Sequence, residues 1–279
     1  MISLPVVKLN QGIHVMHLFH RLDRRSWSQL PAGESDQTRA RLEALCAAHS
    51  APSHPRLCTY AGVGGKADLA WILYAADLVQ LGQMHHDLEA CFPPDTLQQV
   101  FSYLSVTELT EYMPTEEDNR RQLLEHEKLA PDSEAFQKRW QEMQQRKADY
   151  ERYRLYPELP DLEVMVFYPM NKRRQGADNW YSLDFAARKR LMGGHARVGR
   201  KYAGRVTQLI TGSTGLDDWE WGVTLVAHQV DALKEIVYEM RFDEVSARYG
   251  EFGPFYVNLR LSPAALWEHL HLVPDVTRK

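Results

Sequence analysis

The order of the predicted elements repeats once along the chain, and this repeat constrains the fold more than any other feature. Apolar residues at alternate positions predict strands, and apolar stripes at helical spacing predict helices. Both halves follow the order strand, helix, strand, strand, helix, strand, which is typical of a ferredoxin-like unit. In the first half these elements fall at residues 12–20, 35–49, 57–62, 68–76, 77–90 and 97–109. In the second half they fall at residues 162–170, 182–200, 205–212, 219–227, 229–241 and 253–260.

A charged segment with helical character separates the two halves. Residues 115–154 carry many acidic and basic side chains, with Pro131 as a break. Such a pattern predicts a connector with a solvated face. We therefore expect an α+β fold in three parts: an N-terminal ferredoxin-like half at 1–114, a helical connector at 115–160 and a C-terminal ferredoxin-like half at 161–279.

The strand at 162–170 carries a tyrosine near its end. One face of this strand is formed by Leu162, Val164, Val166, Tyr168 and Met170, because alternate residues of a strand share a face. The opposite face is also mostly apolar, which predicts a strand buried on both sides. One interpretation of Tyr168 is a core tyrosine whose hydroxyl bonds a backbone carbonyl. The other is a reactive group presented at the end of a core strand.

Three cations follow this tyrosine. Lys172, Arg173 and Arg174 leave the same strand end that presents Tyr168. A run of cations is usually a solvated loop. The position also suits a site for carboxylates, because arginine binds them through forked hydrogen bonds and lysine binds them as a point charge.

The next predicted helix places a histidine on its apolar face. Ser182 is expected to cap this helix, with Asp184 in its first turn. The apolar stripe consists of Leu183, Ala187, Leu191, His195 and Val198. A histidine in such a stripe is usually a hydrogen-bonded core residue. However, Gly193 and Gly194 precede it, and each glycine inside a helix costs about 1 kcal/mol relative to alanine. Close approach of a flat group explains them, and an iron porphyrin with His195 as its axial ligand is such a group.

A glutamine interrupts the apolar face of the following strand. Val206, Gln208 and Ile210 share one face of the strand at 205–212. Leaving a buried amide without a partner costs roughly 1–3 kcal/mol, so Gln208 needs a hydrogen-bond partner. The partner can be a neighbouring loop, or it can be a ligand bound to an iron below the strand.

These residues resemble the motifs of the coproheme decarboxylases, a branch of the chlorite dismutase family. Residues 168–172 match the motif YPM-x-K, and residues 195–204 match H-[GA]-x-x-GRKYAG. Residues 208–213 fit the family's glutamine motif V-x-Q-I/L-I-TGS, and GLDDWEWGVTL and MRFDEVSARYGEFG follow from Gly215 and Met240. The resemblance is dense over residues 150–262. It extends weakly into the first half through SYLSVTELTEY near Ser102.

The resemblance implies a role for each of nine residues. It implies that Tyr168 is the catalytic residue, that His195 is the axial iron ligand and that Gln208 lies on the distal side of the iron. The residues implied to contact the porphyrin or its propionates are Arg154, Pro169, Met170, Asn171, Lys172 and Ser246. It also implies that the two halves form a dimeric α+β barrel, with the haem-type site in the C-terminal half.

The reaction implied by the resemblance is peroxide-dependent decarboxylation. The substrate, which also serves as the cofactor, is iron coproporphyrin III (coproheme). Hydrogen peroxide oxidises the iron, a radical forms on Tyr168, and two propionates become vinyl groups to give haem b. This is the last step of coproporphyrin-dependent haem biosynthesis. The family further implies a homo-oligomer, a pentamer, and contact with the ferrochelatase that supplies the substrate.

Two other functions fit part of this pattern. A chlorite dismutase or related peroxidase shares the fold, but that branch has a distal arginine where this chain has Gln208. A haem carrier or sensor needs the histidine and the pocket, but it does not need Tyr168 with a lysine nearby. Both differences favour decarboxylation.

Composition excludes other classes of function. The formal net charge of the 279 residues is −4, so nothing favours a nucleic-acid partner. Cys46, Cys58 and Cys91 are odd in number and are expected to be reduced, as in a cytoplasmic protein. The N-terminal sequence lacks the basic and apolar regions of a signal peptide. No apolar run is long enough to predict a membrane span.

Overall fold

The computed structural model describes residues 4–272, and their fold is α+β, as the sequence predicts. The strands are β1 (His14–Leu22), β2 (Arg56–Val63), β3 (Leu69–Ala75), β4 (Leu97–Val106), β5 (Val164–Lys172), β6 (Thr207–Gly212), β7 (Trp221–Ala227), β8 (Gly250–Phe252) and β9 (Tyr256–Arg260). The α-helices are α1 (Arg24–Ser28), α2 (Glu34–Ala48), α3 (Leu78–Ala90), α4 (Glu116–Arg121), α5 (Glu134–Leu155), α6 (Phe185–Arg200), α7 (Val230–Met240), α8 (Glu244–Tyr249) and α9 (Pro263–His269).

The strands form one antiparallel sheet. Their order is β7-β6-β4-β1-β3-β2-β9-β5-β8, and β5 also pairs with β7. The strand order therefore returns to its starting strand. The junctions between the two parts of the chain are short. Four residue pairs join β2 to β9, and at the other junction Val106 of β4 pairs with Gly212 of β6.

Three apolar clusters explain why apolar side chains on the strands point alternately to the two faces of the sheet. Val15 and Phe19 of β1 and Met165 and Phe167 of β5 meet in one cluster, between strands from both parts of the chain. Leu18 of β1 faces the opposite way, into a second cluster. The other face of β5 belongs to a third cluster, which contains Val164, Val166 and Tyr168 together with residues of α7. The prediction of a strand buried on both sides is confirmed.

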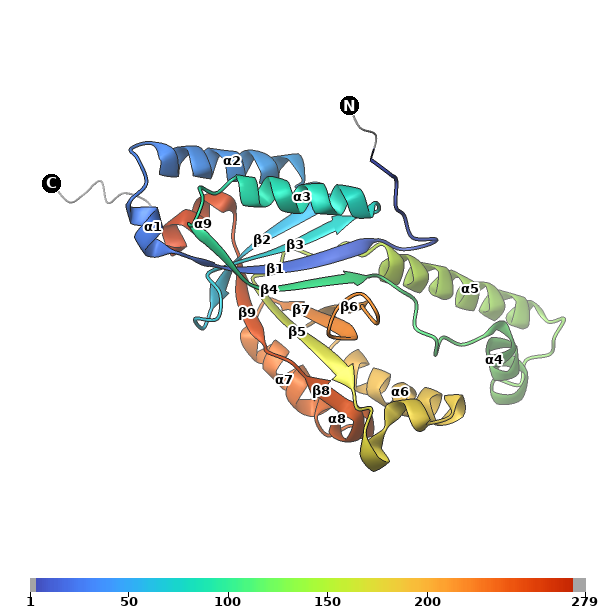
Figure 1. Cartoon of the computed structure of the whole chain (residues 1–279). Helices are drawn as coiled ribbons and strands as arrows, with labels where there is room; N and C mark the ends of the chain where they lie inside the picture. The colour runs from blue at the N-terminus through green and yellow to red at the C-terminus, as the bar shows by residue number, and fades with distance from the viewer. Residues whose placement is uncertain (1–3, 273–279) are drawn as a thin grey trace.

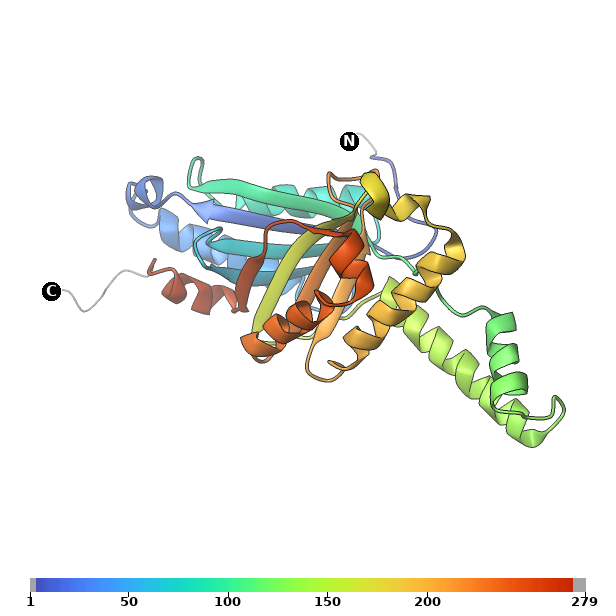
Figure 2. The same cartoon turned by 90° about the horizontal axis from the view of Figure 1, so that it is seen from below.

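The helices lie in two groups on opposite sides of the strands. Figure 1 shows α2, α3 and α9 beside β1, β2 and β3, and α6, α7 and α8 beside the C-terminal strands. Figure 2 shows the same three C-terminal helices in front of those strands, seen from below. The candidate residues of the second half therefore lie between these strands and α6, α7 and α8.

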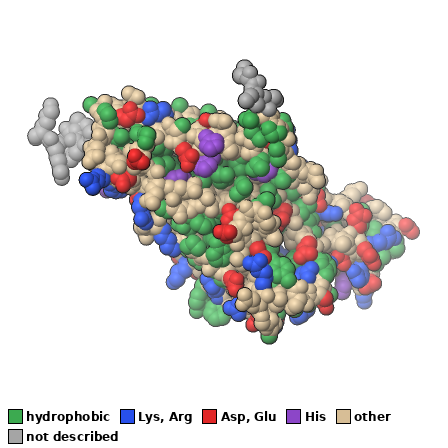
Figure 3. Space-filling model, viewed as in Figure 1, with side chains coloured by type: hydrophobic (Ala, Val, Ile, Leu, Met, Phe, Trp, Pro, Cys, Tyr) green, Lys and Arg blue, Asp and Glu red, His purple; other side chains and the backbone are tan. Residues whose placement is uncertain are grey.

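The connector forms an arm that projects from the rest of the molecule. It contains α4, a short π-helical turn (Gln122–His126) and α5, with Leu123 and Phe136 buried between them. Figures 1 and 2 show the far end of this arm away from the sheet. Acidic and basic side chains are interspersed over the arm in Figure 3, as predicted for a solvated face. An ion pair between Lys189 and Asp118, 2.7 Å long, links α6 to α4.

The structure corrects some details of the predicted elements. Asp184, not Ser182, caps α6: its side chain accepts a hydrogen bond from the backbone N–H of Ala187, and the helix begins at Phe185. A carboxylate suits this position because it also compensates the helix dipole. The short helices α1, α8 and α9 were not predicted, because five to seven residues give too little periodicity. Cys46, Cys58 and Cys91 are free. Within residues 4–272 no helix is both long and apolar enough to cross a membrane.

Candidate active site

Three of the predicted site residues share one face of the C-terminal strands. Tyr168 and Lys172 are four residues apart on β5 and so point to the same side. Gln208 of β6 pairs with Leu225 of β7, and Leu225 pairs with Val166 of β5. Cross-strand partners point to the same side of a sheet, so Gln208 lies on the face that carries Tyr168.

Tyr168 is held by aromatic rings. Its side chain is 4% exposed and stacks on Phe255, with ring centroids 4.4 Å apart, beside Phe252 at 5.8 Å. Burial raises the pKa of Tyr168 far above its usual value, against a smaller opposing effect of Arg241. The phenol is therefore neutral at physiological pH. Among residues 4–272 its hydroxyl bonds no backbone carbonyl, so the interpretation as an ordinary core tyrosine lacks its expected partner.

Lys172 is a buried cation at the end of the same strand. Its Nζ lies 4.9 Å from the centre of the Trp180 ring, a cation–π distance. Burial lowers the pKa of Lys172 to about 8, against the opposing carboxylates of Asp243 and Glu220. Lys172 is thus mostly protonated at neutral pH, in a place where a bound anion gains from its charge.

The remaining residues of this strand end are partly structural. Glu220 accepts a hydrogen bond from the backbone N–H of Lys172 at 2.8 Å and donates its own N–H to Oδ1 of Asn171 at 2.7 Å. The carbonyl of Pro169 accepts the N–H of Gly253 at 2.8 Å, and Met170 is half-buried in the third cluster. Arg173 and Arg174 are themselves exposed, and they lie 4.0 Å from the carboxylate of Asp178 and 3.9 Å from the buried carboxylate of Glu220, respectively.

His195 is oriented by a carboxylate that the sequence analysis did not single out. Its Nδ1 lies 3.0 Å from Oδ2 of Asp243. Asp243 caps α8, and it also accepts hydrogen bonds from the backbone N–H and the hydroxyl of Ser246, at 3.0 Å and 3.1 Å. Burial alone would raise the pKa of Asp243, but the hydrogen bonds and charge of His195 and the hydrogen bonds from Ser246 lower it below its usual value. An ionised carboxylate can only accept, so Nδ1 is the donor, and in the neutral ring this leaves the lone pair on Nε2.

The surroundings of His195 suit a metal that brings other ligands with it. Among residues 4–272 no group of three or more His, Cys, Asp or Glu side chains could hold a metal ion. A single histidine is the ligand that a protein commonly gives to a metalloporphyrin, whose ring supplies the other donors. A Cβ placed on Gly193 would meet no atom within 4 Å, and one on Gly194 would meet only the Arg197 guanidinium at 3.7 Å. Open space thus adjoins the backbone next to the histidine.

Gln208 and Arg154 are brought together by the end of α5. The hydroxyl of Tyr153 donates to the carbonyl of Gln208 at 2.7 Å, so Arg154 lies at the same edge. The Gln208 side chain approaches α6: a Cβ on Gly199 would lie 3.4 Å from its Nε2. Gly199 is one turn beyond His195, so Gln208 and His195 lie on neighbouring parts of two facing elements.

The structure thus groups the predicted residues around α6. His195 and Ser246 both contact Asp243, and the charge of Asp243 acts on Lys172. Tyr168 lies on the same face of the sheet as Lys172. Gln208 and Arg154 lie at the β6 edge of that face. Two further residues emerge, Asp243 and Arg241, whose guanidinium lies 3.8 Å from the centre of the Phe252 ring. The sequence offered one signal for Asp243. It is a capping residue that is followed three residues later by the hydroxyl of Ser246.

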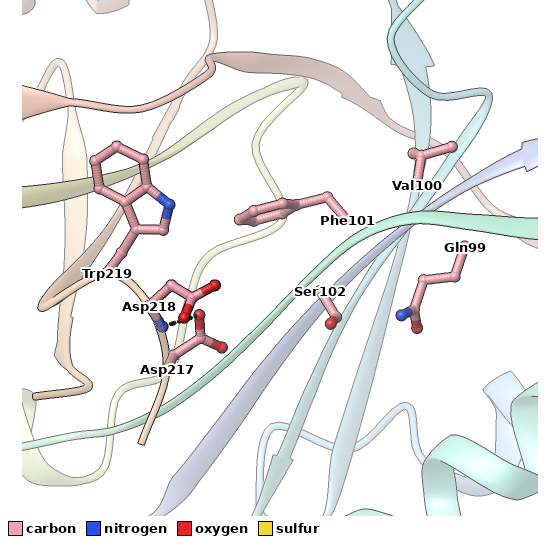
Figure 4. Close-up of a pocket in the computed structure, with 7 residues that line it drawn as sticks. All are labelled: Gln99, Val100, Phe101, Ser102, Asp217, Asp218 and Trp219. Atoms are coloured by element: carbon pink, nitrogen blue, oxygen red, sulfur yellow. Dashed lines mark hydrogen bonds between the residues drawn. The ribbon is translucent and has the colours of Figure 1, made fainter. Parts of the chain in front are cut away.

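A separate hollow lies at the exposed side of β4. It has a volume of about 440 Å³ and is lined by Gln99, Val100, Phe101, Ser102, Asp217, Asp218 and Trp219. Figure 4 shows the Phe101 and Trp219 rings across this hollow, above Asp217 and Asp218. The Asp217 carboxylate accepts hydrogen bonds from the backbone N–H groups of Leu104, at 3.1 Å, and Asp218, at 2.8 Å. None of the predicted site residues lines this hollow, so it is distinct from the site around α6.

Comparison with known proteins identifies the family of the chain. Residues 36–261 match the family model described as chlorite dismutase. A structure described as a novel heme-binding protein from Thermus thermophilus is 37% identical, covers 97% of this chain and 99% of its own, and gives a TM-score of 0.76. A mutant chlorite dismutase from Candidatus Nitrospira defluvii is 17% identical, covers 94% and 96% of the two chains, and gives a TM-score of 0.68. The chlorite dismutase of that organism in complex with imidazole is also 17% identical, covers 94% and 96%, and gives 0.67. At 17% identity the likeness concerns the fold alone.

Proposed function

The chain belongs to the chlorite dismutase family, and from this premise we propose that it is a coproheme decarboxylase. Its substrate is iron coproporphyrin III, and its oxidant is hydrogen peroxide. Two of the four propionates lose their carboxyl groups as carbon dioxide and become vinyl groups, and the product is haem b. The observation that carries this proposal is the shared sheet face of Tyr168, Lys172 and Gln208, which lies beside the helix that presents His195.

Binding of the substrate follows from the charges of the site. Propionates are anionic at neutral pH, and burying them is costly unless each finds a partner. Arg154 and Lys172 supply a guanidinium with one free donor group and a buried cation, Ser246 supplies a hydroxyl that would have to turn from Asp243 to the ligand, and the strand end at Pro169, Met170 and Asn171 would complete the edge of the binding site. The Thermus relative, described as heme-binding, supports a porphyrin as the ligand.

The role of Asp243 is to fix the histidine. Nδ1 of His195 donates to this carboxylate, so the lone pair of Nε2 would be available to bind the iron of the substrate. A carboxylate on the far nitrogen also makes the imidazole a stronger donor to the metal. Gln208 supplies an amide on the opposite side of the substrate and carries no charge, which distinguishes this site from one that holds an anionic oxidant with an arginine.

Tyr168 is the group that attacks the substrate. The oxidising equivalent passes from the iron to the neutral phenol, which loses an electron and its proton. The resulting radical removes a hydrogen atom from the β-carbon of a propionate. Loss of a second electron and of carbon dioxide leaves a vinyl group. For each propionate, one hydrogen peroxide and one proton are consumed and two water molecules are formed. Lys172 is the contact for the second propionate.

A haem carrier is the main alternative, and the description of the Thermus relative fits it equally well. The two functions differ in their need for Tyr168. A carrier needs His195 and its pocket, whereas a decarboxylase also needs a phenol beside a propionate.

The test is a titration with iron coproporphyrin III, followed by hydrogen peroxide and mass spectrometry of the porphyrin. We expect tighter binding of coproheme than of haem b, and stepwise loss of two carboxyl groups on addition of peroxide. Recovery of intact coproheme after the iron has reacted with peroxide would exclude the decarboxylase.

We also propose the finer architecture implied by the family. In this proposal the two halves are a ferredoxin-like duplication whose strands form a dimeric α+β barrel. The chain assembles as a homo-oligomer, a pentamer, and receives its substrate from a ferrochelatase. Sedimentation of the purified protein tests the subunit number.

A further inference from the structure

A carboxylate that has no assigned role lies on the face of the sheet that carries Gln208. Glu108 follows β4, inside the segment SYLSVTELTEY. Gly212 shares the face of Gln208, because they are four residues apart on β6. A Cβ on Gly212 would point into the Glu108 carboxylate, 2.7 Å from its Oε2. Glycine at position 212 is therefore what allows this carboxylate to lie against the sheet.

Arg154 is fixed to the same residue. Its Nε and Nη2 donate to the backbone carbonyl of Glu108 at 3.4 Å and 3.2 Å. Within residues 4–272 Arg154 forms no ion pair with a carboxylate, and its Nη1 has no hydrogen-bond partner. The arginine is thus held in place by a neutral acceptor and keeps both its charge and one donor group for a ligand.

The neighbours of Glu108 come from three strands and a helix. Arg154 of α5 and Tyr103 of β4 are the titratable groups that interact with it, and Gly212 of β6 and Trp221 of β7 lie beneath it. Although the residue as a whole is exposed, its carboxylate is crowded by the sheet. This desolvation raises the pKa of Glu108, against the smaller opposing effects of Arg154 and Trp221.

We propose that Glu108 is a further substrate-binding residue: when a porphyrin carboxylate occupies Arg154, Glu108 takes up a proton from solvent and donates a hydrogen bond to that carboxylate. The inference rests on the proposed function, because it requires a porphyrin carboxylate at Arg154. Two anionic carboxylates brought close together repel each other, whereas a carboxylic acid and a carboxylate form a short hydrogen bond.

This arrangement makes binding depend on pH in a defined direction. The ligand neutralises Arg154 and adds a negative charge, so the bound state retains a proton that the free protein loses as pH rises. Affinity is therefore highest at acidic pH and falls as Glu108 ionises in the free protein, by up to about tenfold per pH unit for one linked proton.

The test uses the metal-free porphyrin, coproporphyrin III, so that binding is measured without iron chemistry. Its fluorescence gives a Kd for the wild type and for Glu108→Gln from about pH 5 to about pH 7, a range in which Lys172 is mostly protonated. Glu108→Gln keeps the shape and donates a hydrogen bond at every pH. We expect the two affinities to be most similar at the acidic end and to diverge as pH rises, to roughly tenfold tighter binding by the variant at the upper end. The control is Glu117→Gln, which removes the same charge from the exposed surface of α4 and should follow the wild type.

Each outcome bears on a different claim. A constant ratio of the two Kd values across this pH range overturns the role of Glu108 and leaves the decarboxylase proposal intact. Absence of coproporphyrin III binding by the wild type overturns the proposed function and this inference with it. A thermal melt of Glu108→Gln that matches the wild type verifies that the comparison concerns binding and not folding.

Discussion

The hydroxyl of Tyr168 is one oxygen on a ring whose packing does not depend on it. The ring is held by Phe252 and Phe255, and these contacts persist in a phenylalanine. At this scale the function of the site can be separated from its stability, because the reactive atom and the packing atoms differ.

Tyr168→Phe should therefore bind coproheme like the wild type and unfold at the same temperature. Its iron should still react with peroxide, but the porphyrin should remain unreacted coproheme, because phenylalanine has no hydroxyl proton to lose. Mass spectrometry of the porphyrin after peroxide addition measures this. Formation of haem b by this variant would exclude the radical route through Tyr168.

In the proposed site, Asp243 would act on the iron through His195. Asp243→Asn preserves the cap of α8, since asparagine is an equally good capping residue, but it removes the negative charge that Nδ1 faces. Loss of such a partner typically weakens a metal site by about 10–100-fold. We expect weaker coproheme binding and a lower iron–histidine stretching frequency by resonance Raman spectroscopy. Glu244→Gln, which affects a carboxylate paired at the surface with Arg248, should change neither quantity.

At the scale of the element, α6 combines low helix propensity with open space. Gly193 and Gly194 weaken the helix, yet neither would place a Cβ in a clash. Packing within the chain therefore does not require them. Their presence fits a flat ligand beside the helix.

Gly193→Ala with Gly194→Ala should accordingly separate stability from binding. Each substitution should stabilise the free protein by about 1 kcal/mol, while the two methyl groups should reduce coproheme affinity by occupying the ligand's space. Chemical denaturation and porphyrin titration measure the two effects. Gly82→Ala on α3, where a Cβ also meets nothing within 4 Å, should give the stability gain alone. Undiminished affinity in the double variant would remove the explanation offered for the glycines.

The elements also show what the sequence could predict. The alternation in β5 predicted a core strand ending in Tyr168, because period-two burial is a local pattern. The contact between His195 and Asp243 could not be predicted in this way, since it joins helices 48 residues apart in sequence. For Glu108 the obstacle was the same: its neighbour Gly212 belongs to another half of the chain. Caps and long-range side-chain contacts depend on packing, which single-sequence periodicity does not contain.

At the scale of the whole molecule, two buried histidines link stability to pH. His17 is fully buried between the strands of both halves, stacks on Phe167 and lies 2.8 Å from the hydroxyl of Thr224. Burial lowers the pKa of His17 to about 3. Burial, and then the charge of His85, lower the pKa of His20 to about 4. The unfolded chain binds these protons near pH 6.5 and the folded chain does not, so stability falls as pH drops below about 6.5.

We expect the free energy of unfolding to decrease by up to about 2.7 kcal/mol per pH unit between about pH 6 and about pH 4.5, the slope for two protons. His17→Gln should reduce this slope by about half. Urea denaturation across this range measures it, and His86→Gln, at an exposed histidine of α3, serves as the control. An unchanged slope in His17→Gln would mean that His17 is not neutral in the folded protein.

The single residue pair at the junction of β4 and β6 has a consequence for turnover. In the described part of the chain, Val106 and Gly212 are the only residues paired between these strands. Glu108, Arg154 and Gln208 lie along the same junction. Separation of β4 from β6 at this junction breaks few backbone hydrogen bonds. A rigid porphyrin ring could therefore leave through the junction without disrupting a strand pairing. We expect amide hydrogen exchange at residues 106–112 to be fast in the free protein and slow once porphyrin bridges this junction, whereas β6 stays protected by its six residue pairs with β7. The molecule would then open at the junction where the fewest residue pairs join its strands. Release of the product would limit the rate of turnover.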